Sequence, residues 1–352
     1  MGQAFTLLNP GPINVSENVR RALADSEDQC HREVEYLEMQ TRVREKLARA
    51  FGVEDTYDPV LVSGSGTAAM EMMVCSAASD GVLVLDNGVY GDRLKQMAEV
   101  HGIRCKVLQL PWTERPDPEA IEAALEDGID TIACVHHETT VGLLNDVPAI
   151  AAVAHRTGRR LIVDSVSGLG GEAFDFNLIQ PTAVCSTANK CVQGLPGVSF
   201  VFVAKGTALR RRSVYFDMAN QLAKQAAGGT PFTPAIQVTA ALEAALDELL
   251  EETVAGRQAR YARAAGVLRD ILSQSGLDLL LPDGLLSNTI TCAKLPEGVT
   301  YETLHAHLRS QGYVIYAGQG DLQESVWRVC NMGIIPDERL HGFADALAGV
   351  NA

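Results

Sequence analysis

The stretch "DSVSGLGGEAFDFNLIQPTAVCSTANKCVQGLPG" (residues 164–197) decides the fold because two apolar runs here each lead into an ionisable side chain. RRLIV (159–163) precedes Asp164, and TAVCSTA (182–188) precedes Lys190. Short runs of this kind predict strands, and similar runs recur along the chain. The predicted strands are residues 59–63, 81–86, 104–110, 130–137, 159–164, 182–188 and 198–204.

Helical segments lie between most of these strands. Examples are TAAMEMMVCSAA (67–78), DRLKQMAEVHG (92–102) and VPAIAAVAHRTG (147–158). Strands that alternate with helices indicate a mostly parallel sheet covered by helices on both faces. The sequence therefore predicts an α/β fold.

A second, smaller unit follows a long helical stretch at about 234–275. After it, strand and helix patterns alternate on a shorter scale, as in SNTITCAKLP (287–296) and YETLHAHLRSQG (301–312). We predict a large domain at 1–255, which includes the N-terminal segment, and a small α+β domain at 256–352. One long helix could bridge the two domains.

Composition narrows the class of function. The chain has 352 residues and a formal net charge of −15, which disfavours nucleic acid or an anionic membrane as a partner. Neither a secretory signal nor a membrane span is apparent, so a cytoplasmic location is expected. The eight cysteines form no CxxC pair, which argues against disulfides and a structural zinc.

The turn SGSGT (63–67) is a candidate anion site, because a glycine-rich turn follows a strand there and opens a helix. Such a turn presents free amides and the positive end of the helix dipole to a phosphate. Ser65, Gly66 and Thr67 are the candidate donors. A tight turn that needs glycine would give the same letters.

Asp164 and Lys190 complete a pattern. A carboxylate at a strand end can pair with a protonated ring nitrogen, and an amine can form an imine. Taken alone, Asp164 could be a helix cap and Lys190 a solvated loop residue. Together with the phosphate turn, however, they supply the three anchors that pyridoxal phosphate (PLP) requires.

Two further strand ends fit the same cofactor. Tyr90 follows strand 81–86 and could lay its ring against the cofactor face. Thr139 follows strand 130–137, where its hydroxyl could reach the ring oxygen. The neighbouring His136 and His137 have no acidic or cysteine partners at ligand spacing, so no metal site is predicted.

The chain resembles the class V, fold-type I PLP-dependent aminotransferases over essentially its whole length. The resemblance rests on ordered motifs: LLNPGP (7–12), SGSGT, NGVYGDR (87–93), HHETTVG (136–142), VDSVSGLGG (163–171), STANKCVQGLPG (186–197) and FTPAIQVTAALEAAL (232–246). Within the class, CHREVEY (30–36) and STANKCVQGLPG are most similar to the aminotransferases that move an amino group from 2-aminoethylphosphonate to pyruvate.

The resemblance implies roles for individual residues. Lys190 would be the lysine that bonds the cofactor, Asp164 the partner of the pyridine nitrogen, and Ser65, Gly66, Thr67, Tyr90 and Thr139 further cofactor contacts. Thr233 would complete the phosphate site of a neighbouring subunit, which implies a homodimer with composite sites. Arg328 would bind the acid group of the substrate, with Arg32 adding positive charge nearby.

Three other functions stay open from the sequence. An aminotransferase for alanine or serine with glyoxylate or pyruvate needs only a different pocket around Arg328. A cysteine desulfurase would need a mobile nucleophilic thiol, for which Cys191 and Cys330 are the nearest candidates in sequence. A nucleotide-binding or regulatory module would have no need of Lys190.

Overall fold

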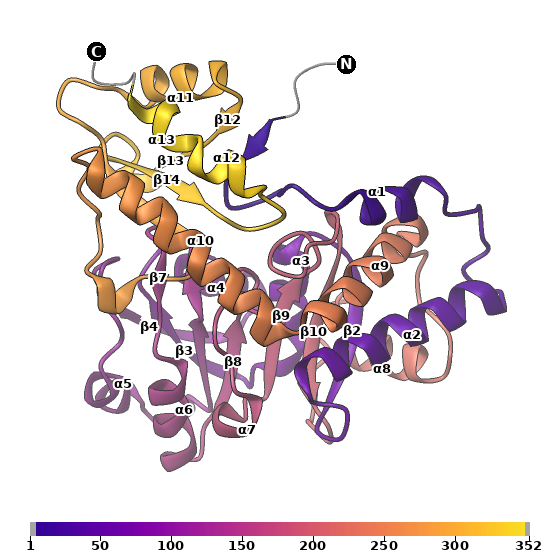
Figure 1. Cartoon of the computed structure of the whole chain (residues 1–352). Coiled ribbons are helices and arrows are strands. Elements are labelled where there is room, and N and C mark those ends of the chain that lie inside the picture. Colours follow the sequence, from indigo (N-terminus) through magenta and orange to yellow (C-terminus); the bar gives the residue numbers. More distant parts are fainter. Residues whose placement is uncertain (1–4, 349–352) are drawn as a thin grey trace.

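A computed structural model describes residues 5–348. Its centre is a seven-stranded sheet, in which β10 runs antiparallel to both of its neighbours and all other pairs are parallel. The predicted, mostly parallel α/β sheet is confirmed (Figure 1). In spatial order the strands are β2 (Tyr57–Gly64), β10 (Gly197–Ala204), β9 (Ala183–Thr187), β8 (Arg160–Asp164), β5 (Thr131–Val135), β3 (Gly81–Asp86) and β4 (Arg104–Gln109).

Helices cover both faces of this sheet because its strands are apolar on both sides. In β3, Val82 and Val84 enter one core cluster, while Leu83 and Leu85 enter the other. The valine side packs against α3 (Gly66–Ala77), α4 (Val89–Val100) and α8 (Met218–Ala226). The leucine side packs against α2 (Val34–Phe51), α5 (Pro118–Ala124), α6 (Val147–Arg156), α7 (Phe176–Ile179) and α9 (Ile236–Glu252).

The predicted helical stretch 234–275 consists of two helices. The helix α9 ends at Glu252, and α10 (Val254–Gln274) begins after Thr253, which has a φ of 66°. The Thr253 hydroxyl accepts a hydrogen bond from the amide of Gly256 at 3.0 Å and so caps α10. The chain therefore turns two residues before the predicted boundary, and α10 runs diagonally towards the smaller sheet (Figure 1).

The C-terminal part is built on a three-stranded antiparallel sheet of β11 (Ile290–Lys294), β14 (Val326–Cys330) and β13 (Tyr316–Ala317). The N-terminal strand β1 (Thr6–Leu7) pairs in parallel with β12 (Tyr313–Val314). The remaining elements are α1 (Glu17–Ala24), the hairpin β6 (His137–Glu138) and β7 (Leu143–Leu144), η1 (Asp283–Leu285), α11 (Tyr301–Ser310), η2 (Gly320–Leu322), α12 (Asp337–His341) and α13 (Phe343–Ala348).

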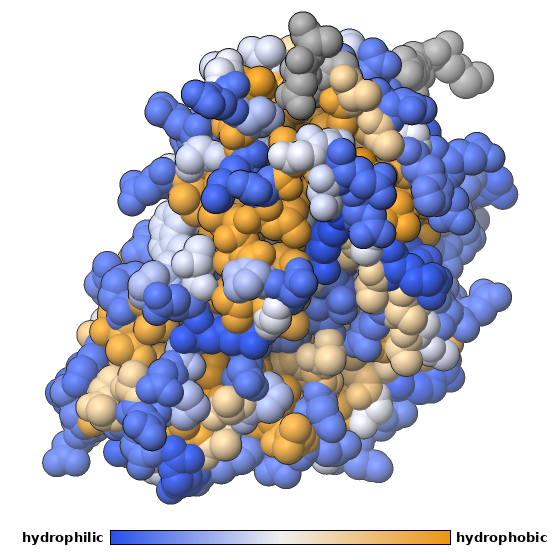
Figure 2. Space-filling view, turned by 60° about the vertical axis from the view of Figure 1, so that its left-hand side comes forward, coloured by the Kyte–Doolittle hydropathy of each residue, from blue (hydrophilic) through white to orange (hydrophobic). Residues whose placement is uncertain are grey.

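The surface carries apolar as well as polar side chains. Figure 2 shows hydrophobic residues gathered on one face of the molecule, with hydrophilic residues around them. Across the whole described surface, Val100 and Val214 are among the most exposed large apolar side chains. No helix within residues 5–348 is both long enough and apolar enough to cross a membrane.

Candidate functional site

Asp164 is the last residue of β8, and the turn with Lys190 follows the adjacent strand β9. The Asp164 side chain is buried, and its Oδ1 accepts hydrogen bonds from the Val166 amide at 2.9 Å and the Cys185 thiol at 3.7 Å. Its Oδ2 accepts none from residues 5–348 and is available to a further donor. Burial raises the pKa of Asp164, and the nearby positive charge of Lys190 opposes that rise.

Lys190 lies in a compact turn that points its side chain towards Tyr90. The Gln193 amide donates to the Lys190 carbonyl at 2.9 Å, and the Gly194 amide donates to the Ala188 carbonyl at 2.7 Å. The Lys190 Nζ is 5.8 Å from the centroid of the Tyr90 ring. Gly11 lies beside the lysine, since a Cβ there would be in van der Waals contact with the lysine Cε at 3.6 Å.

A residue at the start of α10, Arg257, holds the backbone of this turn. Sequence reasoning missed this residue. Arg257 is 1% exposed, and its Nη1 donates to the carbonyls of Cys191 and Val192 at 3.0 and 3.1 Å. Its Nε donates to Glu252 at 2.7 Å. Each carbonyl gains a charge-assisted hydrogen bond, so the backbone after Lys190 is held to the helix.

The turn SGSGT opens α3 as the sequence predicts. A Cβ on Gly66 would lie 2.6 Å from Val166, so only glycine fits there. Ser65 is the N-cap residue, yet its side chain makes no capping hydrogen bond, and the first turn of α3 has no acidic residue. The guanidinium of Arg93, missed from sequence, donates to the Thr67 hydroxyl at 3.4 Å. The local charge therefore suits an anion.

Tyr90 is positioned by a buried carboxylate that sequence reasoning also missed. Glu138 is fully buried, and its Oε2 accepts from the Tyr90 amide at 3.1 Å. Its Oε1 accepts from the amide and the hydroxyl of Thr140 at 3.0 and 2.6 Å. Burial raises the pKa of Glu138 to about 7. This carboxylate ties the start of α4, and with it Tyr90, to the segment that carries Thr139.

The Thr139 hydroxyl is buried and has no hydrogen-bond partner among the described residues. The residue is 1% exposed, and its backbone carbonyl accepts from Arg328 Nη1 at 2.8 Å. An unpaired buried hydroxyl is costly unless a ligand completes it. Thr139 is therefore available to hydrogen-bond a ligand beside Arg328.

Arg328, on β14, is a second buried side chain with a hydrogen-bond donor that no described residue uses. It is 1% exposed, Nε donates to the Ala317 carbonyl at 2.8 Å, and Nη1 donates to Gln319 Oε1 at 3.0 Å. Its Nη2 is buried without a partner, and no carboxylate of residues 5–348 forms an ion pair with it. A buried guanidinium without a counter-charge is expected to take an anionic ligand.

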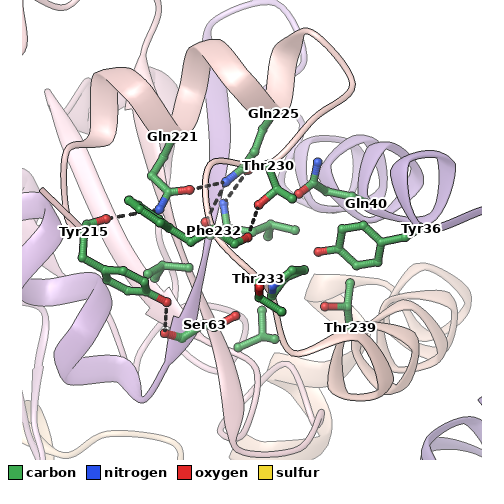
Figure 3. A pocket seen from close by; sticks show the side chains of 14 residues that line it. Tyr36, Gln40, Ser63, Tyr215, Gln221, Gln225, Thr230, Phe232, Thr233 and Thr239 are labelled. Carbon is green, nitrogen blue, oxygen red and sulfur yellow. Dashed lines mark hydrogen bonds between the residues drawn. The ribbon is translucent and has the colours of Figure 1, made fainter. Parts of the chain in front are cut away.

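Thr233 and Arg32 lie elsewhere in the chain. Thr233 is exposed and lines a narrow cavity between α2, α8 and α9, whose free volume is about 20 Å³ (Figure 3). Arg32 is exposed just before α2. Within the described part of this chain, neither residue makes a hydrogen bond or ion pair with Lys190 or Asp164.

The histidines and cysteines considered in the sequence analysis are buried: His136, His137, Cys191 and Cys330. Burial lowers the pKa of His136 to about 4 and that of His137 to about 3. Residues 5–348 contain no group of three or more His, Cys, Asp or Glu placed to hold a metal. Cys191 donates its thiol to the Ser167 carbonyl at 3.2 Å, and burial raises the thiol pKa of both Cys191 and Cys330 to about 12. Neither thiol has the exposure or low pKa of a mobile nucleophile.

Comparisons with known proteins identify the family of the chain. The Aminotransferase class-V family model matches residues 10–323. A 2-aminoethylphosphonate–pyruvate transaminase of Vibrio cholerae serotype O1 is 34% identical across 99% of this chain and 98% of its own. One from Syntrophobacter fumaroxidans is 34% identical across 97% and 95%. The structure of an alanine–glyoxylate aminotransferase from Nostoc sp. superposes with a TM-score of 0.92 at 27% identity, covering 100% of this chain and 96% of that one.

Proposed function

The chain belongs to the class-V aminotransferases, PLP-dependent enzymes, and from this premise we propose that it transfers the amino group of 2-aminoethylphosphonate to pyruvate, giving phosphonoacetaldehyde and alanine. For amino transfer, the supporting observation is that Asp164 and Lys190 leave adjacent strands beside Tyr90. For the substrate, it is the buried Arg328 without a counter-charge, together with the names of the 34% identical relatives.

The residues present fit PLP. The hydrogen bonds of Asp164 to the described residues use Oδ1, so Oδ2 could accept from a ring nitrogen. The unpaired Thr139 hydroxyl could reach a ring oxygen. The turn of Ser65, Gly66 and Thr67 would hold the phosphate at the start of α3. The ring of Tyr90 would stack on the cofactor.

Bound PLP would supply an electron sink for the substrate carbon that carries nitrogen. The chain's own residues would control the protons. Lys190 would bond the cofactor through Nζ and, once released, accept the proton from that carbon on Nζ. Asp164 would keep a proton on the ring nitrogen, because its buried negative charge stabilises a positive partner. Arg328 would orient the acid group of either substrate.

The site would be completed by a second copy of the chain. Thr233 and Arg32 are exposed and make no contact with Lys190 in their own subunit, as expected of residues that serve a neighbour. The surface near them is partly apolar: Val34 is 57% exposed and Val214 is 71% exposed. We propose a homodimer in which Thr233 reaches the partner's phosphate turn and Arg32 lies near its substrate.

A half-reaction screen tests the substrate. The holoenzyme is mixed separately with 2-aminoethylphosphonate, taurine, alanine and serine, and loss of the cofactor absorbance is followed. We expect 2-aminoethylphosphonate and alanine to bleach the cofactor, since they are the two amines of the proposed reaction. Bleaching by amino acids alone would remove the phosphonate assignment. It would favour an enzyme for alanine with glyoxylate, the activity named for the Nostoc structure.

A further inference from the structure

The guanidinium of Arg328 has one nitrogen, Nη2, left for a substrate. Nε is used by the Ala317 carbonyl, and Nη1 is used by the Thr139 carbonyl and by Gln319. Both remaining hydrogens are on Nη2. Bidentate recognition of an acid group takes parallel N–H groups from two nitrogens. Arg328 alone cannot provide that edge without breaking an existing bond, so a second donor is needed.

Gln319 lies beside Arg328 and has a donor to spare. Its Oε1 accepts from Arg328 Nη1 at 3.0 Å, and the opposite orientation of the amide would place two donors against each other. The oxygen is therefore fixed towards the arginine, and Nε2 is the free end. Within residues 5–348, Nε2 makes no hydrogen bond.

The backbone around Gln319 is held in place. The Gly318 amide donates to the Val326 carbonyl at 3.0 Å, and the Leu322 amide donates to the Gln319 carbonyl at 3.1 Å. Gly320 packs so closely on Trp112 that a Cβ there would lie 2.6 Å from the indole ring. The segment therefore presents Gln319 from a fixed position.

We propose that Gln319 is a substrate-binding residue whose side-chain amide donates to the acid group of the substrate beside Arg328 Nη2. The inference rests on the proposed function for the identity of that acid group. The two donors belong to separate planar groups, so they can reach two oxygens of a tetrahedral phosphonate without sharing one plane. Tyr316, whose ring centroid is 5.1 Å from Arg328 Cζ, covers the guanidinium.

Binding of unreactive anions to the holoenzyme tests Gln319 directly. Ethylphosphonate and propionate carry the acid group but no amine, and their dissociation constants are measured by titration calorimetry. Gln319→Met removes the donor and should weaken ethylphosphonate binding about 10-fold. Gln319→Glu would pair with Arg328 and should weaken it about 100-fold, because the charge is then neutralised.

Gln323→Glu is the matched control. Gln323 is exposed on the same segment, makes no side-chain hydrogen bond to the described residues, and the change alters the net charge equally. The affinity of the Gln323→Glu variant for ethylphosphonate should equal that of the wild type. Unchanged affinity in both Gln319 variants would overturn the proposal. If the wild type prefers propionate, the phosphonate assignment fails. A loss of propionate affinity in Gln319→Met would then still support Gln319 as a substrate-binding residue. Wild-type enzyme that binds neither anion would overturn both.

Discussion

Replacing Arg257 with methionine should destabilise the holoenzyme and loosen the turn that carries Lys190. The buried guanidinium makes hydrogen bonds to the carbonyls of Cys191 and Val192 and to Glu252. A hydrogen bond to a charged group contributes about 1.5–3 kcal/mol, and the two carbonyls would lose theirs. Glu252 keeps Arg260 at 2.7 Å, so no carboxylate is stranded. The expected loss is therefore about 3–6 kcal/mol.

Arg42→Met is the matched control for this change. The Arg42 side chain is 49% exposed and pairs with Glu243, which keeps Lys46 as a second partner at 3.1 Å. An exposed pair of this kind contributes at most about 1 kcal/mol. Both variants thus replace an arginine and leave its carboxylate partner with one remaining cation. They differ mainly in how deeply the replaced arginine is buried.

Urea unfolding at saturating PLP, followed by circular dichroism, measures both losses. A second titration measures the dissociation constant of PLP. We expect Arg257→Met to lower the unfolding midpoint strongly and to weaken PLP binding, because the turn with Lys190 is no longer fastened. Arg42→Met should change neither appreciably. Equal stability losses in the two variants, or unchanged PLP affinity in Arg257→Met, would refute the reasoning.

Three further outcomes are expected. Thr139→Val should raise the PLP dissociation constant about 5- to 10-fold with little loss of stability, because the deleted hydroxyl has no protein partner; a spectroscopic PLP titration with unchanged affinity would contradict this. Burial raises the pKa of Glu172 to about 8, so its contribution to stability is full below its ordinary pKa and declines as pH rises through 8. Between pH 5.5 and 8.5, the free energy of unfolding measured with urea should decline less in Glu172→Gln than in the wild type. Equal declines would contradict the raised pKa of Glu172. Cys30, the exposed thiol, should react first with a thiol reagent and Cys191 should not react before unfolding, as peptide mapping would show; early labelling of Cys191 would reopen the desulfurase alternative.

The large sheet and the strand-end residues could be predicted because both depend on local patterns. Apolar runs bounded by glycine give the strands, and the carboxyl ends of parallel strands meet at one edge. Asp164 therefore ends one strand, and the turn with Lys190 follows its neighbour, as the spacing indicates. The break at Thr253 was missed because helical periodicity continues on both sides of it, although threonine is a common N-cap.

The residues that position the site could not be predicted, because their contacts join distant parts of the chain. Arg257 reaches Cys191 across 66 positions, and Arg328 reaches Thr139 across 189. Glu138 lies inside the motif HHETTVG, but no local pattern says that it would accept the amide of Tyr90. The pairing of β1 with β12 likewise depends on contact between the two ends of the chain.

The most direct test of the account is borohydride reduction of the holoenzyme followed by peptide mapping. Reduction fixes PLP covalently to the amine that holds it. We predict that the added mass is found on the peptide that contains Lys190, and that Lys190→Ala yields no fixed cofactor and no amino transfer. Label on a different lysine, or turnover in the Lys190→Ala variant, would contradict the placement of the cofactor between Lys190 and Asp164.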